Sequence, residues 1–358
     1  MSEKIFALVM AGGRGTRFWP ESTSKRPKQY LKLFSNNSLL KETLLRFDGM
    51  ILPEQRYIVT VKEQESMAHM EADGEIGENN LIIEPAGRNT APCILLSIAS
   101  LIKNGAGLDD LMVIVPADHV ILNTRGFLAT LGDSLDFIRS KDTLVTIGIP
   151  PTFPHTGYGY IQKGEAILNE VYSVLKFREK PNFETAKAYL KTGHYLWNAG
   201  IFVGRIGRFL AEFKKHAPEI YGFYNALQES ISSFQKTSDI YNQIPKNSID
   251  FAVMEKSDQM SVIPARFDWN DLGSWDALEG VVEKKNQNIF AAIKDAYVSN
   301  SAGNIVFAPN KFATLIDVND LIIVCNEKNV MVISKEKAQK VKDVVEYLEG
   351  HHLKNELL

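Results

Sequence analysis

The sequence predicts an α/β protein with a mostly parallel sheet and a small, separate β unit near its C-terminal end. Apolar runs such as "LMVIVP" are continuous rather than alternating, which indicates strands that are buried on both faces. Longer helical patterns separate these runs, as in a sheet covered by helices. Beyond residue 285 short strands follow one another closely. We therefore expect a Rossmann-like, mostly parallel or mixed sheet in residues 1–285 and a small domain in residues 286–358.

The strands of the larger domain are expected at the continuous apolar runs. These runs are residues 4–10, 56–61, 80–85, 111–116 and 143–149, with helical patterns between them at 38–47, 89–102 and 126–140. Residues 171–205 add two strands around a helix, and a long helical region follows over 206–256. In such sheets the ligand crevice lies beyond the carboxyl ends of the strands, so residues just after each run are the functional candidates.

The C-terminal region has a different pattern. Short apolar runs at 304–309, 313–318, 321–326 and 329–334 have no helices between them, and an amphipathic helix follows at 335–350. Closely spaced short strands of this kind predict a few solenoid-like turns, similar to a left-handed β-helix.

Length and composition exclude several classes of protein. A chain of 358 residues fits two domains, and 45% hydrophobic with 23% charged residues is typical of a globular protein. No apolar run approaches the roughly 18–20 residues that span a bilayer. The N-terminus lacks the layout of a signal peptide, so we expect a cytoplasmic protein. A net charge of −3 argues against nucleic-acid binding, which needs a basic face.

Residues 10–34, "MAGGRGTRFWPESTSKRPKQYLKLF", connect the first expected strand to the first expected helix. The glycines let main-chain amides converge on an anion. The segment is neither a dinucleotide fingerprint nor a P-loop. Prolines 20 and 27 stiffen it, which favours phosphate binding over a solvated basic loop. Its glycines are Gly12, Gly13 and Gly15, and its cations are Arg14, Arg17, Lys25, Arg26 and Lys28.

Two carboxylates stand out in later loops. Asp118 ends the strand of "IVPADH", and Asp271 lies in "WNDLGSW". A single aspartate after a strand often caps a turn. Two well-separated carboxylates also suit one Mg²⁺, which prefers few protein ligands together with phosphate oxygens.

Four further segments carry polar residues with an ordinary structural alternative. "EPAGRNTAP" (84–92) opens a helix, where Asn89 or Thr90 can act as the N-cap. The adjacent charges of "FREKP" (177–181) can be an exposed ion pair, which stabilises little. The glycines of "TGYGYI" (156–161) and "WNAGIF" (197–202) can be turn residues.

Taken together, these motifs resemble the sugar-1-phosphate nucleotidyltransferases. "GGRGTRFWP" and "SKRPKQYLKL" resemble the family signature, and the likeness runs through residues 4–345. The Trp-Pro and Pro-Lys-Gln version resembles members that use GTP and mannose 1-phosphate. The resemblance implies transfer of GMP to the sugar phosphate, Mg²⁺ as the cofactor, and Asp118 and Asp271 as its ligands.

The resemblance also implies roles for single residues. Nucleotide contacts would be Gly12, Gly13, Gly15, Thr16, Arg17, Lys28, Glu84, Pro85, Gly87, Asn89 and Asp118. Sugar-phosphate contacts would be Gly157, Tyr158, Glu179, Lys180 and Asn198. Catalysis would depend on Arg17, Lys28, Asp118, Lys180 and Asp271. We also expect a homodimer, and no isomerase activity of the kind that longer relatives carry.

Three alternatives remain open. The chain could act on another pair, such as dTTP or UTP with glucose 1-phosphate, although "FWP" and "PKQ" argue against this. It could be a silent nucleotide-sugar-binding protein, which has no evident need for two metal carboxylates. A hydride-transfer enzyme is disfavoured because the glycine fingerprint is missing.

Overall fold

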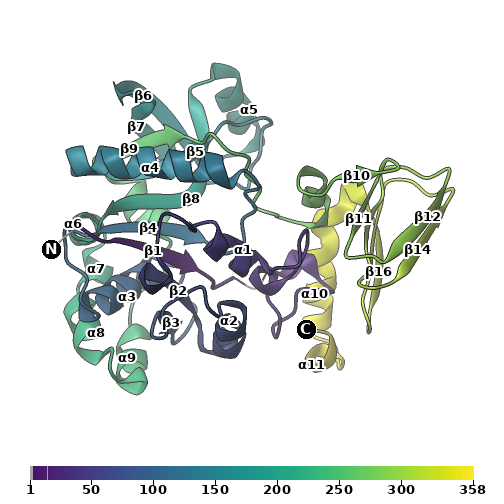
Figure 1. Ribbon diagram of the computed structural model, residues 1–358, viewed down its shortest axis with the longest axis horizontal. Helices are drawn as coiled ribbons and strands as arrows, with labels where there is room; N and C mark the ends of the chain where they lie inside the picture. Colours follow the sequence, from purple (N-terminus) through teal and green to yellow (C-terminus); the bar gives the residue numbers. More distant parts are fainter. Residues whose placement is uncertain (1–2, 14) are drawn as a thin grey trace.

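The computed structural model describes residues 3–13 and 15–358, which form a large α/β part and a smaller β part (Figure 1). Within these residues the large part contains a nine-stranded sheet of order β3-β2-β1-β4-β8-β5-β9-β7-β6. Its strands are β1 (Ile5–Met10), β2 (Arg56–Val61), β3 (Leu81–Glu84), β4 (Leu111–Pro116), β5 (Leu144–Ile149), β6 (Tyr160–Leu168), β7 (Val171–Arg178), β8 (Tyr195–Arg205) and β9 (Met260–Pro264).

The sheet is parallel at one end and mixed at the other. Strands β3, β2, β1 and β4 run parallel to one another. Strand β8 pairs antiparallel with both β4 and β5, and β6 pairs antiparallel with β7. The α/β class, with a mixed and largely parallel sheet, is therefore confirmed.

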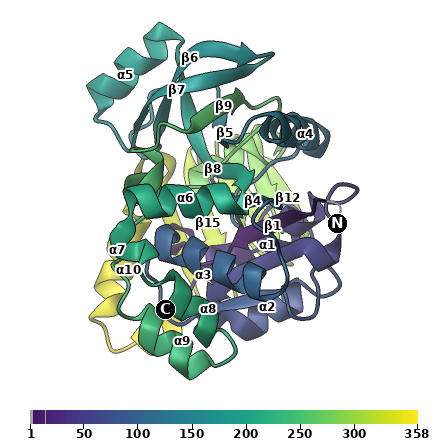
Figure 2. The same ribbon diagram turned by 90° about the vertical axis from the view of Figure 1, so that its left-hand side faces the viewer.

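Helices cover both faces of the sheet, which explains why the central strands are apolar on both sides. One face packs against α3 (Thr90–Lys103), α6 (Ile206–His216), α7 (Pro218–Tyr221), α8 (Tyr224–Ser230) and α9 (Phe234–Tyr241), several of which are in front in Figure 2. The other face packs against α1 (Leu39–Leu45), α2 (Glu65–Glu71) and α4 (Thr124–Ser140), with α5 (Phe183–Thr192) near the β6 end.

The structure refines the expected elements. The helical region expected at 206–256 is present and is divided into several helices, because Pro218 follows the end of α6 and starts the short helix α7. It ends in a π-helical turn, Asp250–Met254. Strands β6 and β9 were not expected as strands.

The C-terminal part is a short β solenoid. Strands β11 (Asn288–Ala291), β13 (Ile305–Phe307) and β15 (Leu321–Cys325) stack in parallel, as do β12 (Asp295–Ser299) and β14 (Phe312–Ile316). Strands β10 (Lys284–Lys285) and β16 (Val330–Ser334) form the two edges of the five-stranded sheet that contains β11, β13 and β15, and both pair antiparallel with their neighbours. Helices α10 (Val341–Glu349) and α11 (Lys354–Leu357) end the chain. The four expected strands are present, and β11 and β12 were missed.

The solenoid and α10 pack against two segments of the large part, the opening loop after β1 and the loop after Asp271. Trp275 is fully buried there, and its ring contacts Phe18 at 4.9 Å and Phe307 of β13 at 5.2 Å between centroids. Its indole N–H donates to the main-chain oxygen of Trp19 at 3.0 Å. Asn326 Nδ2 donates to the oxygen of Pro20 at 3.2 Å. The C-terminal part thus braces both the opening loop and the loop after Asp271.

Among the described residues, none of the helices has the length and apolar character needed to cross a membrane.

Candidate functional site

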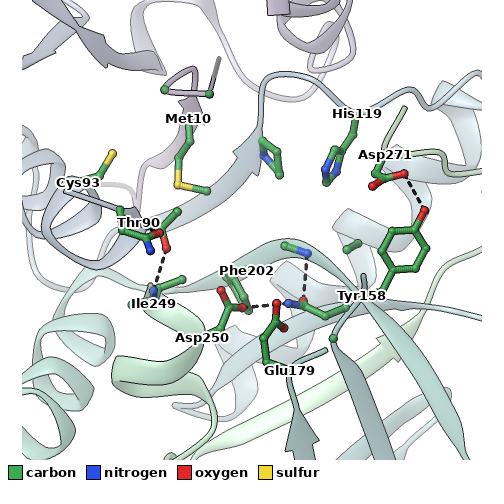
Figure 3. Close-up of a pocket in the computed structure, with 18 of the residues that line it drawn as sticks. Met10, Thr90, Cys93, His119, Tyr158, Glu179, Phe202, Ile249, Asp250 and Asp271 are labelled. Atoms are coloured by element: carbon green, nitrogen blue, oxygen red, sulfur yellow. Dashed lines mark hydrogen bonds between the residues drawn. The ribbon is translucent and has the colours of Figure 1, made fainter. Parts of the chain in front are cut away.

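A cavity of about 450 Å³ opens beyond the carboxyl ends of β1, β3 and β4, where the sequence predicted the ligand crevice (Figure 3). It is lined by Met10, Gly12, Gly13, Glu84, Gly87, Asn89, Thr90, Cys93, Pro116, His119, Gly157, Tyr158, Gly159, Glu179, Asn198, Ala199, Gly200, Phe202, Ile249, Asp250, Trp269 and Asp271. These residues come from both the parallel and the antiparallel end of the sheet. The cavity therefore lies between the parallel end and the antiparallel end of the sheet.

The glycine loop after β1 is held in shape by the side chain of Gln29. Its Nε2 lies 3.0 Å from the main-chain oxygen of Ala11, 3.1 Å from that of Gly13 and 2.8 Å from Gln64 Oε1. Gly15 has φ 61°, and a Cβ there would lie 2.1 Å from Lys28 Cβ, so only glycine fits. Gln29 therefore holds the main chain of the loop at Ala11 and Gly13. The cation Arg14 lies outside the described residues.

Lys28 joins the two aspartates that the sequence singled out. Its ammonium lies 3.0 Å from Asp118 Oδ2 and also donates to the main-chain oxygen of Asp271. The Lys28 side chain is 6% exposed and that of Asp118 is 35% exposed. Burial raises the pKa of Asp118, but the charges of Lys28 and His119 outweigh burial and hold this pKa below its usual value. Asp118 is thus a carboxylate at neutral pH.

The loop of Asp271 is tied to the loop of Asp118 and to the opposite wall. Asn270 and Val120 exchange main-chain hydrogen bonds of 2.8 and 3.0 Å. Leu272 has φ 44°, a strained value for a bulky residue, and its N–H donates to Asn270 Oδ1 at 2.8 Å. Tyr158 donates its hydroxyl hydrogen to Asp271 Oδ1 at 2.6 Å. These contacts fix the Asp271 loop against the Asp118 loop and orient the Asp271 carboxylate toward Tyr158.

Glu84, the last residue of β3, is a buried carboxylate with one oxygen bound to protein. Its Oε1 accepts hydrogen bonds from Arg88 N at 2.9 Å and from the Tyr241 hydroxyl at 2.7 Å. Its Oε2 accepts no hydrogen bond from the described residues and lies toward Gly12. Burial raises the pKa of Glu84, and the two donors oppose this shift. One carboxylate oxygen therefore remains available to the cavity.

In the segment after Glu84, the side chains of Arg88 and Asn89 make structural contacts with the rest of the protein. Asn89 is the N-cap of α3, as expected, and its Oδ1 accepts from Thr90 N at 2.8 Å. The guanidinium of Arg88 donates to the main-chain oxygens of Ile244 and Asn242. Arg88 therefore holds the chain after α9 against this loop.

The antiparallel side of the cavity ends in three polar side chains (Figure 3). Asn198 of β8 donates from Nδ2 to Asp250 Oδ1 at 3.0 Å. Glu179 follows β7, and its Oε1 lies 2.9 Å from Lys180 Nζ, whose side chain is 63% exposed. Burial and the charge of Glu179 raise the pKa of Asp250 to about 6. This wall is rich in hydrogen-bond acceptors.

The family follows from comparison with known proteins. A family model described as "Nucleotidyl transferase" matches residues 6–288. The chain belongs to the nucleotidyl transferase family. A second model, "MannoseP isomerase/GMP-like beta-helix domain", matches residues 297–348, in agreement with the solenoid. The resemblance inferred from the motifs is thereby confirmed.

Relatives of this nucleotidyl transferase cover nearly all of it. A Klebsiella pneumoniae protein named mannose-1-phosphate guanylyltransferase is 38% identical over 96% of this chain and 74% of the relative. An Escherichia coli protein of the same name is 37% identical over 96% of this chain and 74% of the relative. A Thermus thermophilus crystal structure described as mannose-1-phosphate geranyltransferase is 33% identical, with a TM-score of 0.88 over 97% of this chain and 100% of that one.

The structure brings most of the predicted residues of this nucleotidyl transferase to the cavity. Those in its lining are Gly12, Gly13, Glu84, Gly87, Asn89, Gly157, Tyr158, Glu179, Asn198 and Asp271. Lys28 and Asp118 adjoin it through their contacts with each other and with Asp271. The lining given by the described residues does not include Gly15, Thr16, Arg17, Pro85 and Lys180. Thr16 and Arg17 lie on an exposed 3-10 turn, Thr16–Phe18.

Sequence reasoning missed four residues that build the site. Gln29 belongs to the quoted "PKQ" motif, but its role in holding the glycine loop depends on a fold contact. His119 directly follows Asp118, and Trp269 lies in the Asp271 segment; Trp269 Nε1 donates to His119 Nδ1 at 3.2 Å. Asp250 had a readable signal, because it is a lone carboxylate within the otherwise apolar run "IDFAVM".

Proposed function

We propose that this chain transfers GMP from GTP to α-D-mannose 1-phosphate and releases GDP-mannose and pyrophosphate. The names of its relatives, which match over 96% of this chain, support this activity. The observation that carries the proposal is the meeting of Lys28, Asp118 and Asp271 beside the glycine loop. A cation and two carboxylates next to main-chain amides suit a reaction between two phosphate groups. The Thermus thermophilus relative is described as a geranyltransferase. An apolar geranyl chain would fit this cavity poorly, because four carboxylates line it: Glu84, Glu179, Asp250 and Asp271.

The proposed reaction needs no nucleophile from the protein. A phosphate oxygen of the sugar phosphate attacks the α-phosphorus of GTP, and the bond from that phosphorus to the β-phosphate oxygen breaks. The attacking phosphate has a pKa near 6, so at neutral pH it is mostly a dianion and needs no general base. Like charges must approach in line, so the protein contributes positioning and positive charge. We assign Lys28 and Arg17 to the departing phosphates and Lys180 to the sugar phosphate.

The residues at Asp118 and Asp271 fit a divalent cation, which family membership implies. Asp118 Oδ1 lies 4.0 Å from His119 Nε2, too far for a hydrogen bond, and Asp271 Oδ2 accepts no hydrogen bond from the described residues. Hard carboxylate oxygens are the donors that Mg²⁺ prefers. We propose that these two aspartates hold Mg²⁺, which would supply positive charge to phosphate oxygens.

Glu84 supports guanine as the base. Guanine presents an N1–H and an N2 amino group on one edge, and the free Oε2 of Glu84 can accept from them. Adenine presents an acceptor at N1, which a carboxylate repels. The buried setting strengthens this discrimination because an unpaired charge there is costly. We propose Gly12, Gly13, Gly15, Thr16, Pro85, Gly87 and Asn89 as further nucleotide contacts, and Gly157, Tyr158, Glu179 and Asn198 as sugar contacts.

The test is pyrophosphate release by the purified chain with Mg²⁺. GTP, ATP, UTP and dTTP are each combined with mannose 1-phosphate and with glucose 1-phosphate. We expect the fastest release from GTP with mannose 1-phosphate and none with EDTA. A preference for another pair would refute the substrate assignment and leave the family chemistry in place. No release from folded protein that binds nucleotide would favour a silent binding protein.

Three organisational points accompany the proposal. We place the boundary between a catalytic domain and a β-solenoid domain near residue 285, just after β10 begins. We propose a cytoplasmic enzyme, since GTP is its substrate.

We also propose a homodimer, because Tyr297, Phe312 and Ile316 are exposed apolar residues on the small sheet of β12 and β14. Sedimentation of the wild type and of Phe312→Ser would test this, with a monomeric wild type contradicting it.

A further inference from the structure

Asp250 is a cavity residue that neither the motifs nor the proposed reaction uses. It begins the π-helical turn Asp250–Met254, which Glu255 N closes by donating to Asp250 O at 2.9 Å. π-Helical turns occur often at functional sites. Asp250 Oδ1 accepts from Asn198 Nδ2 at 3.0 Å, whereas Oδ2 accepts no hydrogen bond from the described residues. The side chain lies beside Glu179 in the cavity (Figure 3).

The neighbours of Asp250 leave its charge poorly compensated. Glu179 is a second carboxylate on the same wall, and Lys180 pairs with Glu179 through Oε1 rather than with Asp250. Glu255 Oε1 accepts from Glu179 N at 2.9 Å and so fixes this pair of acidic segments. A partly buried carboxylate normally has donors around it. Two adjacent acceptors with few donors suit a ligand that brings its own hydroxyl groups.

The hydrogen-bond network also fixes which oxygen of Asp250 is free. Gly200 N donates to Asn198 Oδ1 at 3.0 Å. This contact holds the Asn198 amide in one orientation, with its NH₂ toward Asp250 Oδ1. Oδ2 is therefore the oxygen presented to the cavity.

We propose that Asp250 is a sugar-specificity residue whose Oδ2 accepts a hydrogen bond from one ring hydroxyl of the sugar 1-phosphate. The inference rests on the proposed function, since it requires a sugar phosphate in this cavity. A site built to accept from a hydroxyl discriminates strongly against an analogue that lacks it, because its acceptor is then left unpaired.

The first test is the Asp250→Asn variant. Asn198 Nδ2 requires an acceptor, so the amide oxygen of residue 250 will face Asn198 and the NH₂ will face the cavity. An acceptor is thereby replaced by a donor with little change of volume. We expect KM for mannose 1-phosphate to rise about 10- to 100-fold, with KM for GTP unchanged. The control is Asp258→Asn, which removes an exposed carboxylate paired with Lys215. An unchanged sugar KM in Asp250→Asn would overturn the proposal.

The second test identifies the hydroxyl with monodeoxy analogues of mannose 1-phosphate. In the wild type, one analogue should be rejected more strongly than the others because it leaves Asp250 unpaired. In Asp250→Asn that rejection should largely disappear, while discrimination against the other analogues remains. A structural role for Asp250 would raise KM for all analogues equally. The same discrimination pattern in both proteins would refute the assignment.

The pH dependence of the sugar KM gives an independent readout. Glu179 and Lys180 are the charged groups that face Asp250, and both remain in the variant. We expect the ratio of the variant KM to the wild-type KM to fall as pH drops below about 6, where Asp250 gains a proton. The ionisation of the sugar phosphate cancels in this ratio. A ratio that stays constant with pH would contradict the proposal.

Failure of the reaction and failure of this inference give different results. If the wild type turns over a different sugar phosphate, the analogue series is made from that sugar, and the same comparison applies. If no pair is turned over, the proposed function fails. Titration calorimetry with GDP-mannose then decides on Asp250: weaker binding by the variant of about tenfold or more supports it, and equal binding refutes it.

Discussion

The two sides of the cavity are built in different ways. The side that we propose for the nucleotide, the nucleotide side, is formed by the ends of β1, β3 and β4 and the loops that follow them, which belong to the parallel end of the sheet and carry Gly12, Glu84 and Asp118. The side that we propose for the sugar, the sugar side, is formed by the antiparallel strands β6 to β8 and by the π-helical turn of Asp250. On the nucleotide side, the functional residues lie at or just after the ends of strands that the sequence predicts. On the sugar side, the functional residues meet only because distant segments pair, so they are harder to identify from the sequence.

Asp271 connects the two sides. Its loop pairs with Val120 near the nucleotide side, and its carboxylate accepts from Tyr158 on the sugar side. The buried Trp275, shortly after it, packs against the C-terminal solenoid. Changes confined to one side should therefore alter one substrate, whereas changes at Asp271 should affect the reaction itself.

The largest effect is expected from Asp271→Ala. Loss of this carboxylate removes a proposed metal ligand that both substrates share, so kcat should fall about 10²- to 10³-fold. Stopped assays of pyrophosphate release at saturating substrates and varied Mg²⁺ would measure it. The control is Asp136→Asn, a carboxylate that is 76% exposed on α4. A variant that keeps more than half of the activity would refute the role of Asp271.

A smaller and more selective effect is expected from Glu84→Gln. Arg88 N and the Tyr241 hydroxyl will hold the amide oxygen, so the new NH₂ will face the donors of guanine. We expect kcat/KM for GTP to fall about 10- to 100-fold, with KM for mannose 1-phosphate unchanged.

Inosine triphosphate, which lacks the 2-amino group, sharpens the Glu84 test. The wild type should prefer GTP to inosine triphosphate, and the preference should shrink in Glu84→Gln. If the variant keeps the full preference, another group reads the base and the proposed role of Glu84 is wrong.

These differences explain how far the sequence could predict the molecule. Continuous apolar runs indicated β1, β2, β3, β4 and β5, because burial on both faces leaves a strong signal in a single segment. Strand β6 was missed since only its first two residues are buried and the rest is partly or fully exposed. Strands β11 and β12 were missed because they are short and depend on stacking against β13 and β14.

The site was predictable where a motif and a strand end coincide. Asp118 and the glycine loop satisfy this condition, and Asp271 was found through its glycine- and tryptophan-bearing loop. No local pattern indicates that Lys28 contacts both aspartates, or that Gln29 holds the glycine loop, because both contacts join segments far apart in the chain. Asp250 stands out as a lone carboxylate in an apolar run, but its contact with Asn198 of β8 is likewise invisible in the sequence.

Asp250, on the sugar side, should lower the stability of the folded protein even though the proposed function requires it. The pKa of Asp250 is raised from 3.8 to about 6, so folding disfavours its charged form. This penalty is absent below about pH 4 and grows as pH rises through 6. At pH 7.5 we expect Asp250→Asn to be more stable than the wild type by about 1–2 kcal/mol, after allowance for partial solvent screening.

Thermal or urea unfolding at pH 7.5 and pH 4 would measure the Asp250 effect. The stability gain of the variant should disappear at pH 4, where the wild-type carboxyl is protonated. The exposed Asp258→Asn change should give no such pH-dependent gain. A variant that is less stable than the wild type at pH 7.5 would show that Asp250 is a structural residue instead.

The smallest effect is expected from Tyr158→Phe, and it tests the division between the two sides. The Tyr158 ring lies 5.2 Å from the rings of both Trp197 and Trp269, so Phe should keep this packing. What is lost is the 2.6 Å hydrogen bond from the hydroxyl to Asp271. If the Tyr158 hydroxyl positions Asp271 and only the ring contacts the sugar, kcat should fall about 5- to 10-fold, more Mg²⁺ should be required, and KM for the sugar should hardly change.

The matched control for Tyr158 is Tyr160→Phe, two residues further along the chain. Tyr160 is fully buried, and among the described residues its hydroxyl bonds only to the main chain of His155, at 3.0 Å to both the nitrogen and the oxygen. It should therefore leave the Mg²⁺ requirement unchanged. A rise in sugar KM for Tyr158→Phe with unaltered Mg²⁺ dependence would show that the hydroxyl serves the sugar and does not position Asp271. The two sides of the cavity would then be independent, because Tyr158 would no longer connect the sugar wall to Asp271.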